Sequence, residues 1–167
     1  MSIGVGNPRT MQVRNQVVGA SANLDVALGD VVAFDATMDS HRVPDVDDVE
    51  NLTADTSWEI GVVTAAQGIP FGGYGPVATG GIIPAVVAQD SSDAVAVGDL
   101  LAVDTTTDVL RFIKATLATD GVVDVTDLTE TAHYMLDIRA RAMEAGTTGS
   151  GEETLDVKII NNPVNFG

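Results

Sequence analysis

The acidic and imidazole side chains are the groups of this sequence that could perform acid–base chemistry. Asp30 and Asp99 stand at matching positions of a repeated segment, so they form a candidate carboxylate pair. We favour a structural role for both, because an Asp that follows a turn glycine accepts hydrogen bonds from the backbone amides of the turn. His41 and His133 are the two histidines, and neither lies within a recognised metal-ligand spacing. We therefore predict no catalytic residue in this set.

A short acidic run offers oxygen ligands of the kind that Ca²⁺ and Mg²⁺ prefer. The run consists of Asp45, Asp47, Asp48 and Glu50. An EF-hand loop starting at Asp45 would need a glycine where Glu50 stands, so we interpret the run as part of a solvated acidic loop. We predict neither a metal nor another cofactor. The chain has no cysteine, and it lacks the Walker A, Gly-x-Ser-x-Gly and His-Glu-x-x-His motifs, so we expect no enzyme.

Three aromatic residues are candidates for contact with a partner protein. Phe71 and Tyr74 lie in the glycine- and proline-rich segment 68–76, and Trp58 is the single tryptophan. Aromatic side chains on loops are favoured anchors at protein interfaces. The alternative is that they close the ends of a barrel.

Residues 1–23 show little periodicity, and we expect them to form an extended N-terminal arm. Arg9 and Arg14 are the charged residues of this segment, whereas the whole chain has a net charge of -16. A basic arm suits contact with an acidic neighbouring subunit or with the capsid surface, although a mobile terminus without function is the alternative.

The overall charge argues against two classes of partner. The 24 acidic residues outnumber the 8 basic ones, so the chain is poorly suited to bind nucleic acid or an anionic membrane. An excess of Asp with few Lys fits a halophilic source, where concentrated salt screens surface charge. An Asp- and Ala-rich proteome is an equally good explanation.

An internal repeat is the most informative feature of the sequence. The segment VALGDVVAFD, residues 26–35, returns as VAVGDLLAVD, residues 95–104, with six of ten positions identical. Gly-Asp predicts a tight turn, and the apolar run after it predicts a short strand that is buried on both sides. The repeat indicates two related β lobes or two halves of one barrel.

The remaining pattern is typical of an all-β protein with short strands and frequent turns. Further strands are predicted at 60–65, 77–79, 82–88, 109–113, 121–125 and 154–160. The segment 136–142 alternates like a strand but contains good helix formers, and we favour the strand. The expected fold is therefore a β-barrel or sandwich with an internal duplication and at most one short helix. It would occupy residues 24–167, with an acidic loop inserted at 39–57.

The order of these motifs resembles a known family, the small capsid decoration or cement proteins of tailed viruses. The resemblance is carried by the two Gly-Asp-plus-strand segments, Ile60–Val63, Gly80–Ile83, the Arg141–Gly146 segment and the terminal Val157–Ile160. It covers residues 27–160. The chain departs from the family pattern in its longer N-terminal arm, in the acidic loop and in extra residues at 115–132.

The resemblance implies a virion structural protein without an active site. Such a protein is made in the host cytoplasm and binds the outer surface of the capsid, commonly as a homotrimer, where it clamps neighbouring major capsid proteins. Residues 1–23 and the aromatic segment 68–76 would be the contact elements. The alternative is a receptor- or glycan-binding module, such as a head fibre or an adhesin domain.

Overall fold

The computed structural model describes residues 8–18, 22–34, 45–47, 60–89, 94–104, 111–115, 138–147, 149 and 151–160, without the side chains of 45–47 and 104. All regular structure in these ranges is β. The strands are β1 (Arg9–Asn15), β2 (Val31–Phe34), β3 (Asp45–Asp47), β4 (Ile60–Val63), β5 (Tyr74–Ala88), β6 (Leu100–Asp104), β7 (Arg111–Lys114), β8 (Ile138–Ala142) and β9 (Glu152–Ile159). The expected all-β fold is therefore confirmed.

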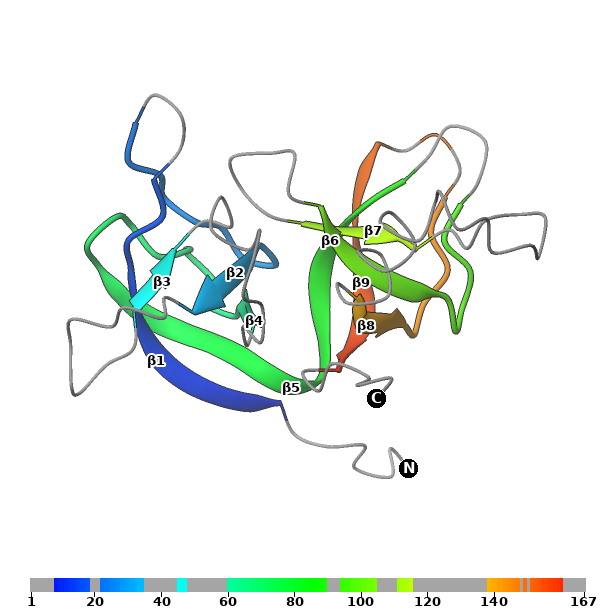
Figure 1. Ribbon diagram of the computed structural model, residues 1–167, viewed down its shortest axis with the longest axis horizontal. Coiled ribbons are helices and arrows are strands. Elements are labelled where there is room, and N and C mark those ends of the chain that lie inside the picture. The colour runs from blue at the N-terminus through cyan, green and yellow to red at the C-terminus, as the bar shows by residue number, and fades with distance from the viewer. Residues whose placement is uncertain are drawn as a thin grey trace, which may run out of the picture.

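The strands form two closed rings that share β5. The first ring runs β1-β3-β2-β4-β5 and closes because β1 also pairs with β5, and the second runs β5-β7-β6-β8-β9 and closes through β5 and β9. We call these rings the N-terminal barrel and the C-terminal barrel. Figure 1 shows them side by side, joined by the long strand β5.

The two barrels have the same topology. The pairing between β1 and β3 is parallel in the first barrel, and so is the pairing between β5 and β7 in the second. In both barrels the other pairings are antiparallel. The second half of β5 therefore corresponds to β1, β6 to β2, β7 to β3, β8 to β4, and β9 to the first half of β5. The repeated sequence segments are the matching corners of two duplicated barrels.

Strand β5 passes from one barrel to the other without a break in its strand structure. Its first half pairs with β1 and β4, and its second half pairs with β7 and β9. Gly81 lies between the halves with a φ of 95°, a backbone conformation that other residues rarely adopt. This glycine lets one strand bend from one barrel into the other (Figure 1).

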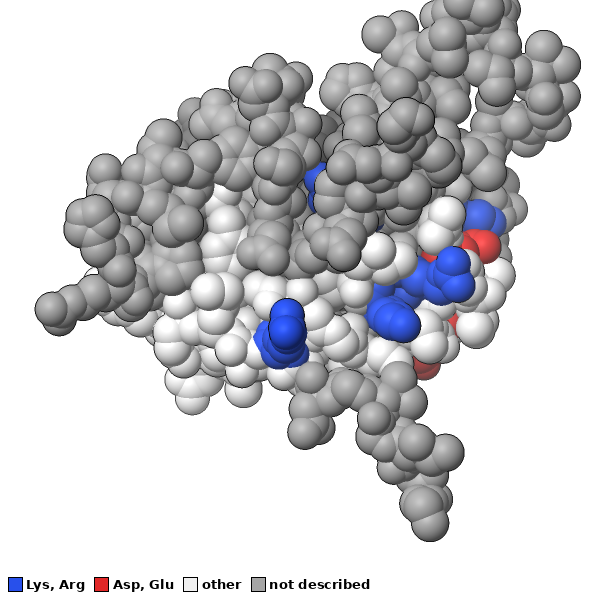
Figure 2. Space-filling model, turned by 60° about the horizontal axis from the view of Figure 1, so that its bottom comes forward, with Lys and Arg blue, Asp and Glu red and all other residues white. Residues whose placement is uncertain are grey.

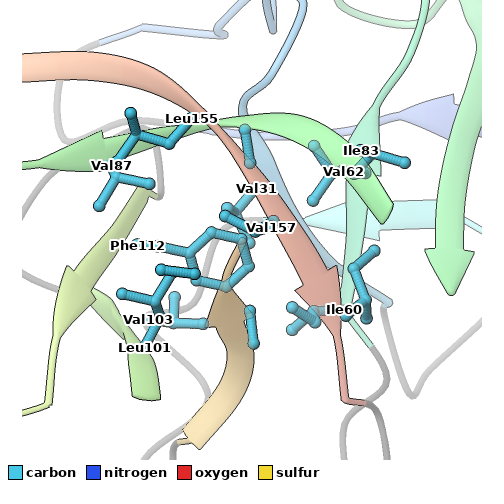
Figure 3. Close-up of a cluster of buried hydrophobic side chains, with 14 of the residues drawn as sticks. Val31, Ile60, Val62, Ile83, Val87, Leu101, Val103, Phe112, Leu155 and Val157 are labelled. Atoms are coloured by element: carbon cyan, nitrogen blue, oxygen red, sulfur yellow. The ribbon is translucent and has the colours of Figure 1, made fainter. Parts of the chain in front are cut away.

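The apolar side chains form two clusters. One fills the N-terminal barrel and includes Val13, Val32, Phe34, Val63 and Val77. The other fills the C-terminal barrel around Phe112, Leu155 and Val157, and it extends to Val31, Ile60 and Val62 of the N-terminal barrel (Figure 3). Alternate residues of β2 and β4 thus enter different clusters, so these strands are buried on both faces, as the apolar run Val31–Phe34 predicted.

Several predicted strands are confirmed, with adjusted ends. They are 60–65 as β4, 109–113 as β7, 154–160 as β9 and the ambiguous segment 136–142 as β8. The two segments predicted at 77–79 and 82–88 are parts of the single strand β5. The strand predicted at 121–125 lies outside the described residues.

Two segments expected to lie outside the barrel contribute strands to it. Within the expected arm, residues 9–15 form β1, and Val13 and Asn15 of this strand are fully buried. Within the expected loop 39–57, Asp45–Asp47 forms β3 between β1 and β2. Short strands of this kind are specified by distant pairing partners, which local composition does not reveal.

Candidate contact surfaces

The two Gly-Asp turns have the same hydrogen bonds. The Asp30 amide donates to the Ala27 carbonyl at 3.2 Å, and the Ala27 amide donates to Asp30 Oδ2 at 2.6 Å. In the second turn the Asp99 amide donates to the Ala96 carbonyl at 3.1 Å, and the Ala96 amide donates to Asp99 Oδ2 at 2.9 Å. Each carboxylate thus closes its own turn, which is the structural role predicted for it.

The surroundings of the two carboxylates differ. Burial raises the pKa of Asp30, the hydrogen bond from Ala27 opposes this, and the nearby Glu152 raises the pKa further. The hydrogen bond from Ala96 lowers the pKa of Asp99, partial desolvation opposes this, and Lys114, with its Nζ 3.1 Å from Oδ2, lowers it further. One carboxylate therefore lies at a covered turn and the other at an open one.

The first turn is covered at its glycine, because Gly29 touches the other barrel, while the neighbouring Leu28 is 49% exposed. The Gly29 carbonyl accepts a hydrogen bond of 2.9 Å from the amide of Val86, which lies on the second half of β5. Gly29 is buried, whereas Gly98, its counterpart in the second turn, is exposed. The turn of the N-terminal barrel is thus part of the contact between the barrels, and the turn of the C-terminal barrel faces solvent.

Two of the predicted contact residues are neighbours across strands. Arg14 on β1 pairs directly with Tyr74, the first residue of β5. Tyr74 is 63% exposed, which is high for a large aromatic side chain, and Arg14 is half-buried. Gln12 and Pro76 form the next cross-strand pair on the same outer side. We call these four residues the aromatic face.

The segment before Tyr74 is held by hydrogen bonds. The Asn15 amide donates to the Gly73 carbonyl, and the Asn15 side chain donates to the carbonyls of Leu24 and Ile69. The Phe71 amide donates to Asp25 Oδ1 at 2.8 Å. Ile69 is buried in the N-terminal cluster and Phe71 is half-buried, whereas Tyr74 is exposed.

Among the other predicted site residues that the structure describes, Arg9 lies away from this face. Arg9 is exposed at the opposite end of β1, opposite Gly80. Trp58, His41, His133, Asp48 and Glu50 lie outside the described residues, and Asp45 and Asp47 are described as backbone of β3. Among the described residues there is no group of three or more acidic or histidine side chains placed to hold a metal ion, and no helix suited to crossing a membrane.

The sequence interpretation missed a basic pair on the C-terminal barrel. Arg141 on β8 pairs directly with Lys158 on β9, and both are exposed. Each residue alternates with apolar neighbours that point inward, so the outward direction of each side chain was predictable. Their proximity was not, because it depends on the pairing of β8 with β9.

No family model matches the chain, and no curated protein is significantly similar to it. A similar solved structure is the crystal structure of the head fiber gp8.5 N base in bacteriophage phi29. The sequence identity is 12%, the match covers 93% of this chain and 97% of that chain, and the TM-score is 0.47. A likeness of this degree does not establish a shared function or partner.

Proposed function

We propose that this chain is a virion structural protein that binds the outer surface of a viral capsid and clamps neighbouring major capsid proteins. The observation that carries the proposal is the sequence resemblance to capsid decoration proteins, together with the place of its motifs in the fold. The two Gly-Asp segments form the equivalent corners of the barrels, and residues 157–159 belong to β9, the strand that closes the second barrel.

The fold suits a clamp for a mechanical reason. A clamp needs contact surfaces that keep a fixed separation, and here two barrels are joined by a continuous strand and by a shared apolar cluster. The aromatic face supplies one surface, because Tyr74 is exposed and Arg14 adds a planar hydrogen-bonding group beside it. Tyrosine and arginine are enriched among the residues that dominate binding energy at protein interfaces.

The proposal includes a role in contact and none in catalysis, with the major capsid protein and further copies of this chain as partners. A homotrimer would place several such faces on one capsid, and weak individual contacts would then combine into stable attachment. Size-exclusion chromatography with light scattering measures the oligomeric state, and a monomer would remove the trimer from the proposal.

The test is cosedimentation of the purified protein with capsids of the virus whose genome encodes it. We expect saturable binding and a higher temperature of capsid disruption. Y74A should weaken binding about ten-fold, which corresponds to roughly 1.4 kcal/mol. The matched control is L28A, another exposed apolar residue of the same barrel, which should bind like the parent. Absence of binding by the parent protein would refute the proposal.

The exposed Tyr74 also favours a second candidate, a receptor- or glycan-binding module. A tyrosine flanked by Arg14 and Gln12 offers a flat apolar surface with hydrogen-bonding groups at its edge. A glycan array separates the candidates. Glycan binding that Y74A abolishes, without affinity for capsids, would favour this second function.

A further inference from the structure

The contact between the barrels identifies one face of this barrel type as a docking face. In the N-terminal barrel, Val31, Val62 and Ala78 are cross-strand neighbours of β2, β4 and β5, and all three are buried in the cluster that fills the C-terminal barrel. Their neighbours along the strands, Val32, Val63 and Val77, lie in the cluster of the N-terminal barrel. Successive side chains of a strand point to opposite faces, so Val31, Val62 and Ala78 point out of their own barrel. The outer face of these strands is therefore covered by the second barrel.

The equivalent face of the C-terminal barrel has different chemistry. The matching cross-strand neighbours of β6, β8 and β9 are Leu100, Arg141 and Lys158. Arg141 and Lys158 are exposed, whereas Val62 and Ala78 are buried. The face of the N-terminal barrel is thus apolar and covered, whereas the equivalent face of the C-terminal barrel carries two positive charges and is open at Arg141 and Lys158.

Apolar side chains border the two charges. The Gly98 amide donates to the Ala142 carbonyl, which places Val97 at the tip of the open turn near Met143. Val97 is 65% exposed and Met143 is 39% exposed. We call the set of Val97, Gly98, Arg141, Met143 and Lys158 the basic face.

The placement of Arg141 opposite Lys158 is unfavourable within the chain itself, because like charges directly across a strand pair repel. In the described part of the chain, neither residue forms an ion pair. Asp156 lies on the same side of β9 as Lys158 and gives the face an acidic edge. Glu144 lies beside Asp156, because Glu144 Oε2 accepts a hydrogen bond of 3.3 Å from the Asp156 amide. Figure 2 shows Lys and Arg side chains projecting from a mostly uncharged described surface on the underside of the molecule.

We propose that the basic face is the second contact surface of the clamp, and that its partner is an acidic protein surface with an apolar border on the capsid. This inference rests on the proposed function. The partner would supply carboxylates to Arg141 and Lys158 and an apolar group to Val97 and Met143. The charged pair would then give orientation and speed of association, and the apolar residues would give much of the affinity.

A second copy of this chain does not suit the basic face if the two copies dock in the way that the two barrels of one chain do. Within the chain, Gly29 of the first turn contacts Val86. Val46 on β3 and Phe112 on β7 are equivalent positions, and they pair with Asn15 and Val87 respectively. Arg14 on β1 is therefore the counterpart of Val86 on β5. Repeating that contact between two chains would bring the basic face against Arg14. Nucleic acid is disfavoured by the net charge of -16.

The test compares two double variants in the capsid cosedimentation assay at low and high salt. R141E/K158E keeps the like-charge pair but reverses its sign, and we expect at least ten-fold weaker binding at low salt, with part of the loss recovered at high salt because salt screens the new repulsion. R141K/K158R exchanges the two residues and keeps both charges, so it should bind like the parent protein. Equal thermal unfolding of both variants shows that the fold is intact.

The outcomes separate this inference from the proposed function. If the parent protein does not bind capsids, the proposed function fails. If the parent binds and R141E/K158E binds equally well, the basic face is not a contact surface and the inference is overturned. Two further results would overturn an acidic protein partner. One is a loss of capsid binding in R141K/K158R as large as that in R141E/K158E. The other is binding of duplex DNA by the parent protein that R141E/K158E abolishes.

Discussion

Asp30 and Asp99 accept the same backbone hydrogen bond in two duplicated turns, yet the pKa of one is raised and that of the other is lowered. The local sequence is nearly the same around both, so the difference arises from what covers each turn. The second barrel desolvates Asp30, whereas Asp99 lies near solvent with Lys114 as its partner. The pair therefore reports on the asymmetry of the duplicated barrels.

The first prediction concerns the removal of each charge. D30N keeps an oxygen that can accept from the Ala27 amide and removes a charge that burial disfavours, so stability at pH 7 should stay the same or rise. D99N removes the charge that strengthens the Ala96 bond and the Lys114 pair, and it should cost about 1 kcal/mol. Urea unfolding measures both. A larger loss in D30N than in D99N would contradict the assigned environments.

The second prediction is the pH dependence of these variants. The folded state raises the pKa of Asp30, so its contribution to stability is present below the ordinary value of 3.8 and is lost as pH rises through the raised pKa. The folded state lowers the pKa of Asp99, so its contribution is present above 3.8 and is lost as pH falls through the lowered pKa. D99N should therefore flatten the acid side of the stability profile. D30N should remove the decline in stability above pH 3.8. Parallel stability profiles of the two variants would disprove the opposite pKa shifts of Asp30 and Asp99.

The third prediction concerns the turn glycines. Gly29 and Gly98 have φ values of 91° and 94°, so G29A and G98A should each cost about 1–2 kcal/mol. An added Cβ at Gly98 meets nothing within 4 Å, whereas at Gly29 it lies 3.4 Å from Val86 Cγ2. Thermal unfolding should thus show G29A to be at least as destabilising as G98A. No loss in either variant would contradict the turn geometry.

The fourth prediction exchanges chemistry between equivalent positions. V62R places a charge on the buried face between the barrels and should destabilise the protein by about 3 kcal/mol or more. R141V changes an exposed position and removes one member of a repelling pair, so its effect should stay within about 0.5 kcal/mol. Chemical denaturation measures the difference. Similar losses in both variants would mean that the two faces are covered alike.

Much of the fold was predictable because its signals are local. Gly-Asp specifies a turn through a backbone conformation and one side-chain hydrogen bond, and both turns form as predicted. The alternation of Leu155, Val157 and Ile159 with polar residues marked β9 in the same way. Strand β1 was not recognised, because the buried Asn15 interrupts its apolar pattern and its partners lie far along the chain.

The candidate site was predictable only in part. The aromatic segment was recognised from composition, and Tyr74 is exposed within it. The pairing of Tyr74 with Arg14 and of Arg141 with Lys158 depends on strand register, which no single segment encodes.

The sequence by itself determined the duplicated corners and the all-β class, because turns and strands follow from backbone preferences and apolar periodicity within a few residues. The tertiary structure decided that the duplicated halves are two closed barrels on one shared strand, and which of two equivalent faces is covered. Burial of a face requires a surface from elsewhere in the chain. For that reason Val62 lies in a core while its counterpart Arg141 meets solvent.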